Sequence, residues 1–154
     1  MTSKTLRWAT AKDMDSVLPL LEEYHRQEGL RKHSKERIRA VLEDLFESPH
    51  RGKVLLAETD NELVGYALVV RRPSFEWASE VAVLDEIFVK GKARDRGLGR
   101  RMISYVEEYA ASEGLPAVTL EVGAENFDAK EFYRSVGFDR VDREIYARTV
   151  GGPR

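Results

Sequence analysis

The segment "EVAVLDEIFVKGKARDRGLGRRMISYVEEY" (Glu80–Tyr109) decides the fold. Its first ten residues are β-rich and almost all apolar, which is typical of a strand buried in the middle of a sheet. A polar turn containing Gly97 and Gly99 follows, and an apolar stripe with helical spacing begins at Leu98. The segment therefore predicts a strand, a glycine turn and a helix, a succession typical of α/β domains.

The sequence on either side predicts further strands and helices. Alternating or apolar runs predict strands over 5–10, 53–59, 62–72, 117–122 and 144–150. Helical spacing and end signals predict helices from Asp13 to Gly29, from Ser34 to Pro49, and over 126–135. The resulting order, β-α-α-β-β-β-α-β-α-β, predicts a single three-layer α/β domain over residues 1–150 with a mixed sheet. We expect residues 151–154 to be a disordered tail.

Composition excludes several classes of site. The 154 residues carry a net charge of −2 and contain no cysteine. Disulfides, cysteine-ligated zinc and a thiol nucleophile are therefore excluded, and the charge argues against nucleic-acid binding. The three histidines lack ligand spacing, so no metal site is expected. No signal peptide or membrane span is evident, so we expect a cytoplasmic protein.

The glycine turn has the composition of an anion site. A helix start presents N–H groups without intrahelical partners, and glycine lets a phosphate approach the backbone. The dinucleotide pattern G-x-G-x-x-G fails because Met102 stands at its last position, and the G-K-[ST] of the mononucleotide loop is absent. The pattern R-x-x-G-x-G fits residues Arg94 to Gly99.

With this motif the chain resembles the GCN5-related N-acetyltransferase (GNAT) family, whose pyrophosphate loop for acetyl-coenzyme A has the same pattern. "LRWATAKDMDSVLPLL", "EVGAENFDAKEFYRSVGF" and "EIYARTV" resemble the family's opening, second signature and closing strand. The resemblance implies a three-layer α/β fold with a mixed central sheet of six to seven strands and about four helices. It also implies a homodimer. Asp95 departs from the pattern, because glycine is usual there.

The resemblance assigns cofactor and catalytic residues. Tyr133 is the candidate general acid that protonates the departing thiolate, and a tyrosine pKa of about 10 suits this only if the hydroxyl is well positioned. A backbone N–H near Phe88 or Val89 is the candidate donor to the thioester oxygen. The expected coenzyme contacts are Ile87, Phe88, Val89, Arg94, Asp95, Arg96, Gly97, Leu98, Gly99, Arg100, Asn126 and Tyr133.

Two carboxylates, Asp85 and Glu86, interrupt the buried strand. A regular strand would point them to opposite faces, whereas a bulge, which the family often carries here, brings both to the acceptor. Glu86 is then the candidate base, directly or through water, and Asp85 attracts a cationic amine. The alternative is a pair of structural salt bridges to the first two helices. Tyr24 and Trp77 are candidates to border the acceptor. His25 is interpreted as helix surface, with a place beside Tyr24 in the substrate cleft as the alternative.

The expected function is acetyl-CoA-dependent N-acetyl transfer to a primary amine by direct attack in a ternary complex. The acidic pair resembles that of the polyamine and diamine acetyltransferases, which implies a small cationic acceptor. Three other acceptors stay open: an amino acid, an aminoglycoside or a protein N-terminus. A non-catalytic module that binds acetyl-CoA is the alternative from another functional class.

Overall fold

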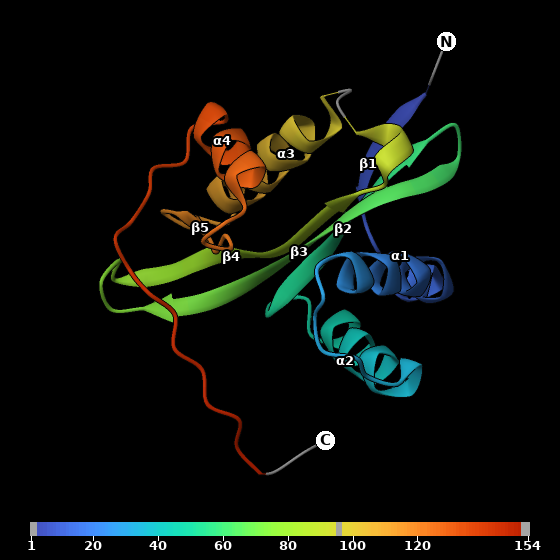
Figure 1. The fold of residues 1–154 in the computed structure, drawn as a ribbon, viewed down its shortest axis with the longest axis horizontal. Helices are drawn as coiled ribbons and strands as arrows, with labels where there is room; N and C mark the ends of the chain where they lie inside the picture. The colour runs from blue at the N-terminus through green and yellow to red at the C-terminus, as the bar shows by residue number, and fades with distance from the viewer. Residues whose placement is uncertain (1–2, 95–96, 152–154) are drawn as a thin grey trace. The chain divides into compact units, whose positions relative to one another are not determined.

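The computed structural model describes residues 3–94 and 97–151. The chain divides into two compact units, Met1–Glu121 and Val122–Arg154. The first unit contains the whole sheet and three of the four α-helices in the described residues, and the second contains the remaining α-helix (Figure 1).

The sheet of the first unit has five strands in the order β1-β2-β3-β4-β5. Neighbouring strands are antiparallel from β1 to β4, and β5 is parallel to β4. The sheet is therefore mixed, as the sequence predicts. The strands are β1 (Lys4–Trp8), β2 (Gly52–Thr59), β3 (Glu62–Ser74), β4 (Ser79–Val89) and β5 (Val118–Leu120).

The hairpin predicted between β2 and β3 is confirmed. Asp60 and Asn61 form its turn with φ of 50° and 64°, a two-residue turn whose twist matches that of the flanking strands. The β3–β4 hairpin is longer than predicted, because β3 continues through Ser74 and the connecting loop shortens to 75–78.

Helices cover both faces of the sheet. Figure 1 shows α1 (Met14–Gln27) and α2 (Lys35–Glu47) on one face and α3 (Leu98–Ser112) on the other. Short 3₁₀ turns, η1 (Ala11–Asp13) and η2 (Gly91–Ala93), precede α1 and α3. Val17, Leu18 and Leu21 of α1 are buried in a core with Val54 and Leu56 of β2 and Tyr66 of β3. Burial of this apolar stripe fixes the rotation of α1 about its axis.

The second unit contains α4 (Phe127–Ser135). Its predicted start is confirmed, because the Asn126 side chain caps the helix and accepts the Ala129 N–H at 3.2 Å. The ring of Tyr133 packs against two neighbours, Phe132 at 5.4 Å and Phe138 at 5.9 Å between centroids.

The prediction of a closing strand at 144–150 is wrong. Residues 139–150 have no regular secondary structure, and Ile145, Tyr146 and Val150 expose most of their surface. The β-branched and aromatic composition suits a strand, but a strand forms only where another strand supplies its hydrogen bonds. The sheet in the described residues consequently has five strands rather than six to seven.

Candidate active site

A β-bulge in β4 places the two carboxylates together. Leu68 pairs with Glu86 and the next residue of β3, Val69, pairs with Leu84, so Asp85 is an extra residue. The alternation of faces is reset at such a bulge, which turns Asp85 to the same side as Glu86. Asp85 is exposed and Glu86 is half-buried.

Both carboxylate oxygens of Glu86 are hydrogen-bonded. The Tyr66 hydroxyl donates to Oε1 at 2.7 Å, and His25 Nε2 lies 2.8 Å from Oε2. The side chains of His25 and Glu86 are 24% and 16% exposed, so the histidine lies nearer to solvent. The alternative of two structural salt bridges to the first two helices is met by one contact only, from Glu86 to His25 of α1.

Glu86 and its partner His25 lie beside three aromatic side chains, Tyr24, Tyr66 and Phe88. We call these five residues the Glu86 cluster. Tyr66 is 1% exposed, and burial raises its pKa, an effect that the charge and hydrogen bond of Glu86 reinforce. Tyr24 packs against Phe88 at 5.5 Å and Tyr66 at 6.2 Å between ring centroids. Tyr66 is therefore a neutral hydrogen-bond donor that holds Glu86 in place.

Tyr66→Phe is expected to destabilise the fold by roughly 1–3 kcal/mol, because it leaves a half-buried carboxylate oxygen without its donor. Urea denaturation measures the loss. The matched control is Tyr146→Phe, which removes a hydroxyl bonded to Glu144 at 2.7 Å on an exposed tyrosine. The control should stay within about 0.5 kcal/mol of wild type, and equal effects of the two changes would contradict a role for Tyr66 in holding Glu86.

The glycine turn ends in a helix start. Gly97 caps α3 with φ of +73°, a left-handed conformation that side chains disfavour, and an added Cβ would meet open space. The Arg101 N–H bonds to the Gly97 carbonyl, so the N–H groups of Leu98 and Gly99 precede the first intrahelical bond. Asp95 and Arg96 lie outside the described residues.

Arg94 braces the turn against the end of the first helix. Its Nε donates to the Val89 carbonyl at 2.8 Å, and its Nη2 donates to Gln27 Oε1 at 3.1 Å. The guanidinium also lies 5.7 Å from the centroid of Phe88. Arg94 therefore links the turn to α1 and β4 beside the Glu86 cluster.

The end of β4 has a strand on one side only. β5 pairs with Ala82, Val83 and Leu84, and its ladder stops at the bulge. Ile87, Phe88 and Val89 pair with β3 alone within the described part of the sheet. Apart from the Val89 carbonyl, which accepts Arg94 Nε, their peptide groups on the other edge have no strand partner in the described sheet.

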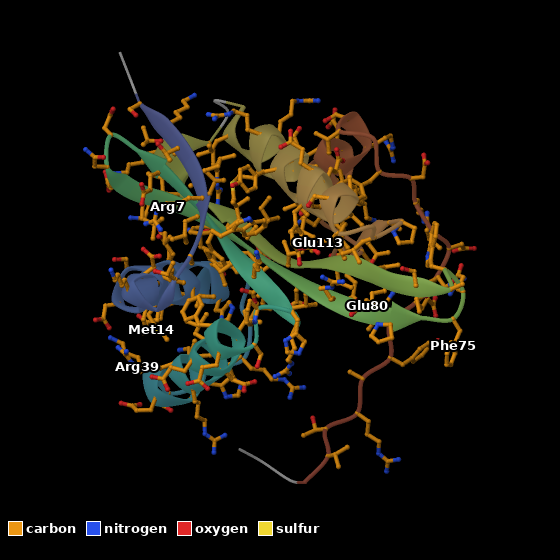
Figure 2. All side chains as sticks on the ribbon, turned by 180° about the vertical axis from the view of Figure 1, so that it is seen from behind. Arg7, Met14, Arg39, Phe75, Glu80 and Glu113 are labelled. Carbon is orange, nitrogen blue, oxygen red and sulfur yellow. The ribbon has the colours of Figure 1, made fainter. Side chains whose placement is uncertain are left out.

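The remaining predicted site residues fall into two groups. Tyr24 lies in the Glu86 cluster, whereas Trp77 lies in the tip of the β3–β4 hairpin, where Phe75 projects outward (Figure 2). Six residues of β3 separate the partner of Glu86 from this tip, about 20 Å of strand. The structure therefore does not bring Trp77 to Glu86. Asn126 and Tyr133 belong to the second unit.

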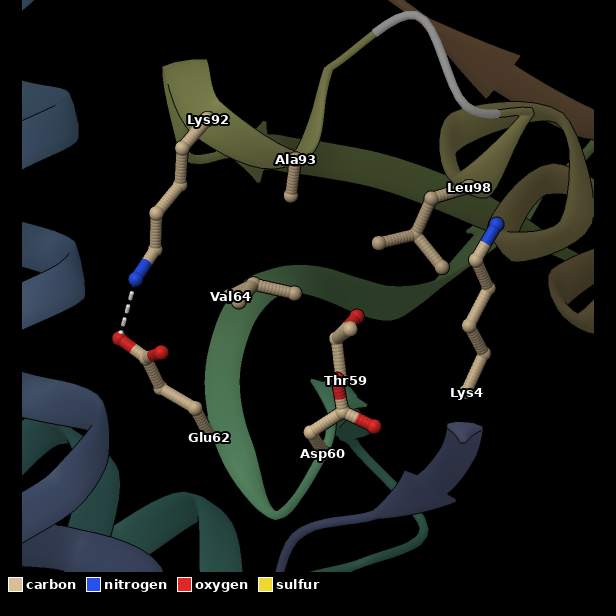
Figure 3. Close-up of a pocket in the computed structure, with 8 residues that line it drawn as sticks. All are labelled: Lys4, Thr59, Asp60, Glu62, Val64, Lys92, Ala93 and Leu98. Atoms are coloured by element: carbon tan, nitrogen blue, oxygen red, sulfur yellow. Dashed lines mark hydrogen bonds and ion pairs between the residues drawn. The ribbon is translucent and has the colours of Figure 1, made fainter. Parts of the chain in front are cut away.

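A separate cavity of about 280 Å³ lies beside the start of α3 (Figure 3). In its lining the Lys92 ammonium donates to the Glu62 carboxylate at 2.6 Å, and this contact lowers the pKa of Glu62. Its lining carries both signs of charge and includes none of the Glu86 cluster. The lining residues are Lys4, Thr59, Asp60, Glu62, Val64, Lys92, Ala93 and Leu98.

Tyr66 is the residue of the cluster that sequence reasoning missed, and His25 was placed in the cleft only as the alternative to a helix surface. A signal existed for His25, which follows Leu18 and Leu21 on the buried stripe of α1 and so faces the sheet. Tyr66 lies in an apolar strand, where the sequence pattern does not distinguish a tyrosine with a role at the site from one that only packs in the core. The described residues contain no group of three or more potential metal ligands and no helix long and apolar enough to cross a membrane.

Comparison with known proteins gives a family match over most of the chain. The family model described as "Acetyltransferase (GNAT) family" matches residues 14–138. The uncharacterized N-acetyltransferase YhfO of Bacillus subtilis is 27% identical over 139 residues, 87% of this chain and 89% of the relative. An aminoglycoside N(6')-acetyltransferase type 1 of Serratia marcescens is 28% identical over 77% of this chain and 84% of its own length.

Solved structures share the fold. The aminoglycoside N-acetyltransferase AAC(6')-Iy, solved in complex with CoA, superposes with a TM-score of 0.86 over 97% of both chains at 19% identity. At this identity the likeness concerns the fold alone. The five-stranded sheet and its helices accordingly belong to a fold in which other chains act as acetyltransferases.

Proposed function

The chain belongs to the acetyltransferase (GNAT) family and is an N-acetyltransferase, and within that class we propose that it transfers acetyl from acetyl-CoA to a small cationic amine. A diamine or polyamine is the first candidate acceptor. The observation that carries the proposal is the bulge that turns Asp85 and Glu86 to one side of β4, next to the open end of that strand.

The coenzyme is proposed to bind along the end of β4 and the glycine turn. The pyrophosphate would accept hydrogen bonds from the first N–H groups of α3, where Gly97 and Gly99 leave room for its oxygens. The open edge of β4 offers the backbone N–H groups of Ile87 and Val89 to the thioester carbonyl, whereas the backbone of Phe88 faces β3. Arg94 supports the turn through Val89 and adds positive charge, and Asp95, Arg96 and Arg100 complete the proposed loop.

The amine is proposed to bind at the acidic pair, with Tyr24 at its border. A primary amine with a pKa of about 10.4 arrives as an ammonium, which has no lone pair. The hydrogen-bonded pair of Glu86 and His25 is proposed to accept the proton of this ammonium, and the exposed Asp85 attracts a further cationic group of the acceptor. Trp77 would border the acceptor only if the loop tip reaches it from another molecule, as in the homodimer that the family resemblance implies.

The chemical step is a direct acyl transfer. The deprotonated nitrogen attacks the thioester carbon, the C–N bond forms and the C–S bond breaks. The thiolate takes the hydroxyl proton of Tyr133, proposed as the general acid by resemblance to the family. Asn126 fixes the start of the helix that carries this tyrosine.

An aminoglycoside is the second candidate acceptor. Relatives named for aminoglycoside acetylation match most of this chain, and aminoglycosides are also multiply charged amines that an acidic pair would attract. Discrimination between the two acceptors depends on the shape around Asp85 rather than on charge.

A panel of acceptors with acetyl-CoA, followed by thiol release, tests the proposal. Putrescine, spermidine, kanamycin, free amino acids and an N-terminal peptide form the panel. Release with a diamine or polyamine supports the first candidate, and release only with kanamycin moves the assignment to the second. Coenzyme that raises the Tm without thiol release from any acceptor would instead indicate a non-catalytic binding module.

A further inference from the structure

We propose that His25 takes the proton of the acceptor amine, with Glu86 as the carboxylate that orients the imidazole. The inference rests on the proposed function and names the path of the proton within it. Its basis is a three-residue array in which Tyr66, Glu86 and His25 are joined by bonds of 2.7 and 2.8 Å.

The hydrogen-bond inventory fixes the tautomer of the imidazole. A carboxylate has only acceptors, so His25 Nε2, 2.8 Å from Glu86 Oε2, must carry the hydrogen of that bond. The neutral ring then has its lone pair on Nδ1. No group in the described part of the chain bonds to Nδ1, so its lone pair is open to the ammonium group of the substrate.

Glu86 is poorly placed to take the proton itself. Its Oε1 accepts the Tyr66 hydroxyl and its Oε2 accepts the histidine, so a substrate ammonium would have to share an oxygen with one of them. Its side chain is also the less exposed of the pair. Glu86 is therefore a positioning residue that stabilises the imidazolium once it forms, and Tyr66 anchors Glu86 in turn.

The surroundings favour transfer to His25. Positive charge that develops on the ring is balanced by the Glu86 carboxylate, while Arg94 is held by Gln27 and Val89. The titratable and charged groups around the pair, from each element packed there, are Tyr24 of α1, Tyr66 of β3, Asp85 and Glu86 of β4, and Arg94 after η2.

The proton balance closes without a further reactant. The ammonium N–H bond breaks and the proton moves to His25 Nδ1, which leaves the amine its lone pair for attack on the thioester carbon. The imidazolium loses this proton to solvent after transfer. A second N–H proton leaves the nitrogen as the amide forms, and through solvent it replaces the hydroxyl proton that Tyr133 has given to the thiolate. His25 thus returns to its neutral form in each turnover.

His25→Gln tests the inference, because the glutamine amide can still donate to Glu86 but cannot take up a proton. We expect kcat with the best amine to fall by about 10²-fold or more near neutral pH. The Tm increase caused by acetyl-CoA should equal that of wild type. The deficit should shrink as the pH approaches about 10, because the amine then arrives unprotonated.

A second variant separates the chemistry from folding. Added imidazole should restore part of the rate to His25→Ala, and a rate that imidazole leaves unchanged would count against the inference. A His25→Gln enzyme within about threefold of wild-type kcat would overturn it while leaving the proposed function intact. If the wild-type enzyme acetylates no amine, both the proposed function and the inference about His25 are contradicted.

Discussion

Gly97→Glu is expected to abolish acetyl-CoA binding while the protein stays folded. An added Cβ at this position meets open space, so the change creates no clash, and the left-handed φ of +73° adds a strain of roughly 1–2 kcal/mol. The new carboxylate would stand at the start of α3, where the pyrophosphate is proposed to bind. Two unit charges about 5 Å apart repel by about 3 kcal/mol at an effective dielectric constant near 20, which corresponds to about 10²-fold in affinity.

Gly97→Gln is the matched control for this variant. The amide has almost the same size and pays the same backbone strain, but it carries no charge. Calorimetric titration with acetyl-CoA should therefore show a moderate loss for glutamine and a further loss of about 10²-fold for glutamate. Equal affinities of the two variants would show that no phosphate approaches Gly97, and the assignment of the turn would fail.

Tyr133→Phe is expected to lower kcat by about 10²-fold or more and to leave acetyl-CoA affinity nearly unchanged. The substitution removes only the hydroxyl, so the ring contacts with Phe132 and Phe138 persist. Without its proton donor the thiolate must leave as an anion. Steady-state kinetics and calorimetric titration on the same preparation measure the two effects.

Tyr146→Phe serves as the control for loss of a tyrosine hydroxyl from the same unit, because its ring is exposed and its hydroxyl bonds to Glu144. It should retain wild-type kcat. If Tyr133→Phe also retains wild-type kcat, another group or solvent protonates the thiolate, and Tyr133 has no part in the mechanism.

Single strands, turns and helices were predictable because apolar runs, glycines and turn residues within a short stretch of sequence indicate them. An apolar run followed by Gly97 and a stripe from Leu98 predicts β4, the turn and α3, and all three are confirmed. The hairpin at Asp60 and Asn61 follows from turn chemistry. The prediction of a strand at 144–150 was wrong. Its composition is a local property of the sequence, whereas a strand also needs a neighbouring strand, which can come from any part of the chain.

The acidic pair was predictable only in part. Two carboxylates in an apolar strand predict a special site, and the register shift at Leu68 and Val69 confirms the bulge. Their partners were not predictable, because His25 lies 61 residues from Glu86 in sequence and meets it only when α1 packs on the sheet. The placement of His25 on the buried stripe of α1 was the one available sign.

The rate of thiol release from acetyl-CoA with putrescine, compared with n-butylamine, tests the central claim most directly. The two acceptors have the same number of carbons and the same kind of reacting amine, and only putrescine carries a second cation for the acidic pair. We predict a kcat/KM at least about tenfold higher for putrescine, a difference that Asp85→Asn should reduce. Equal values for the two amines, or no release with either, would contradict the assignment of this bulge as the site that selects a cationic acceptor.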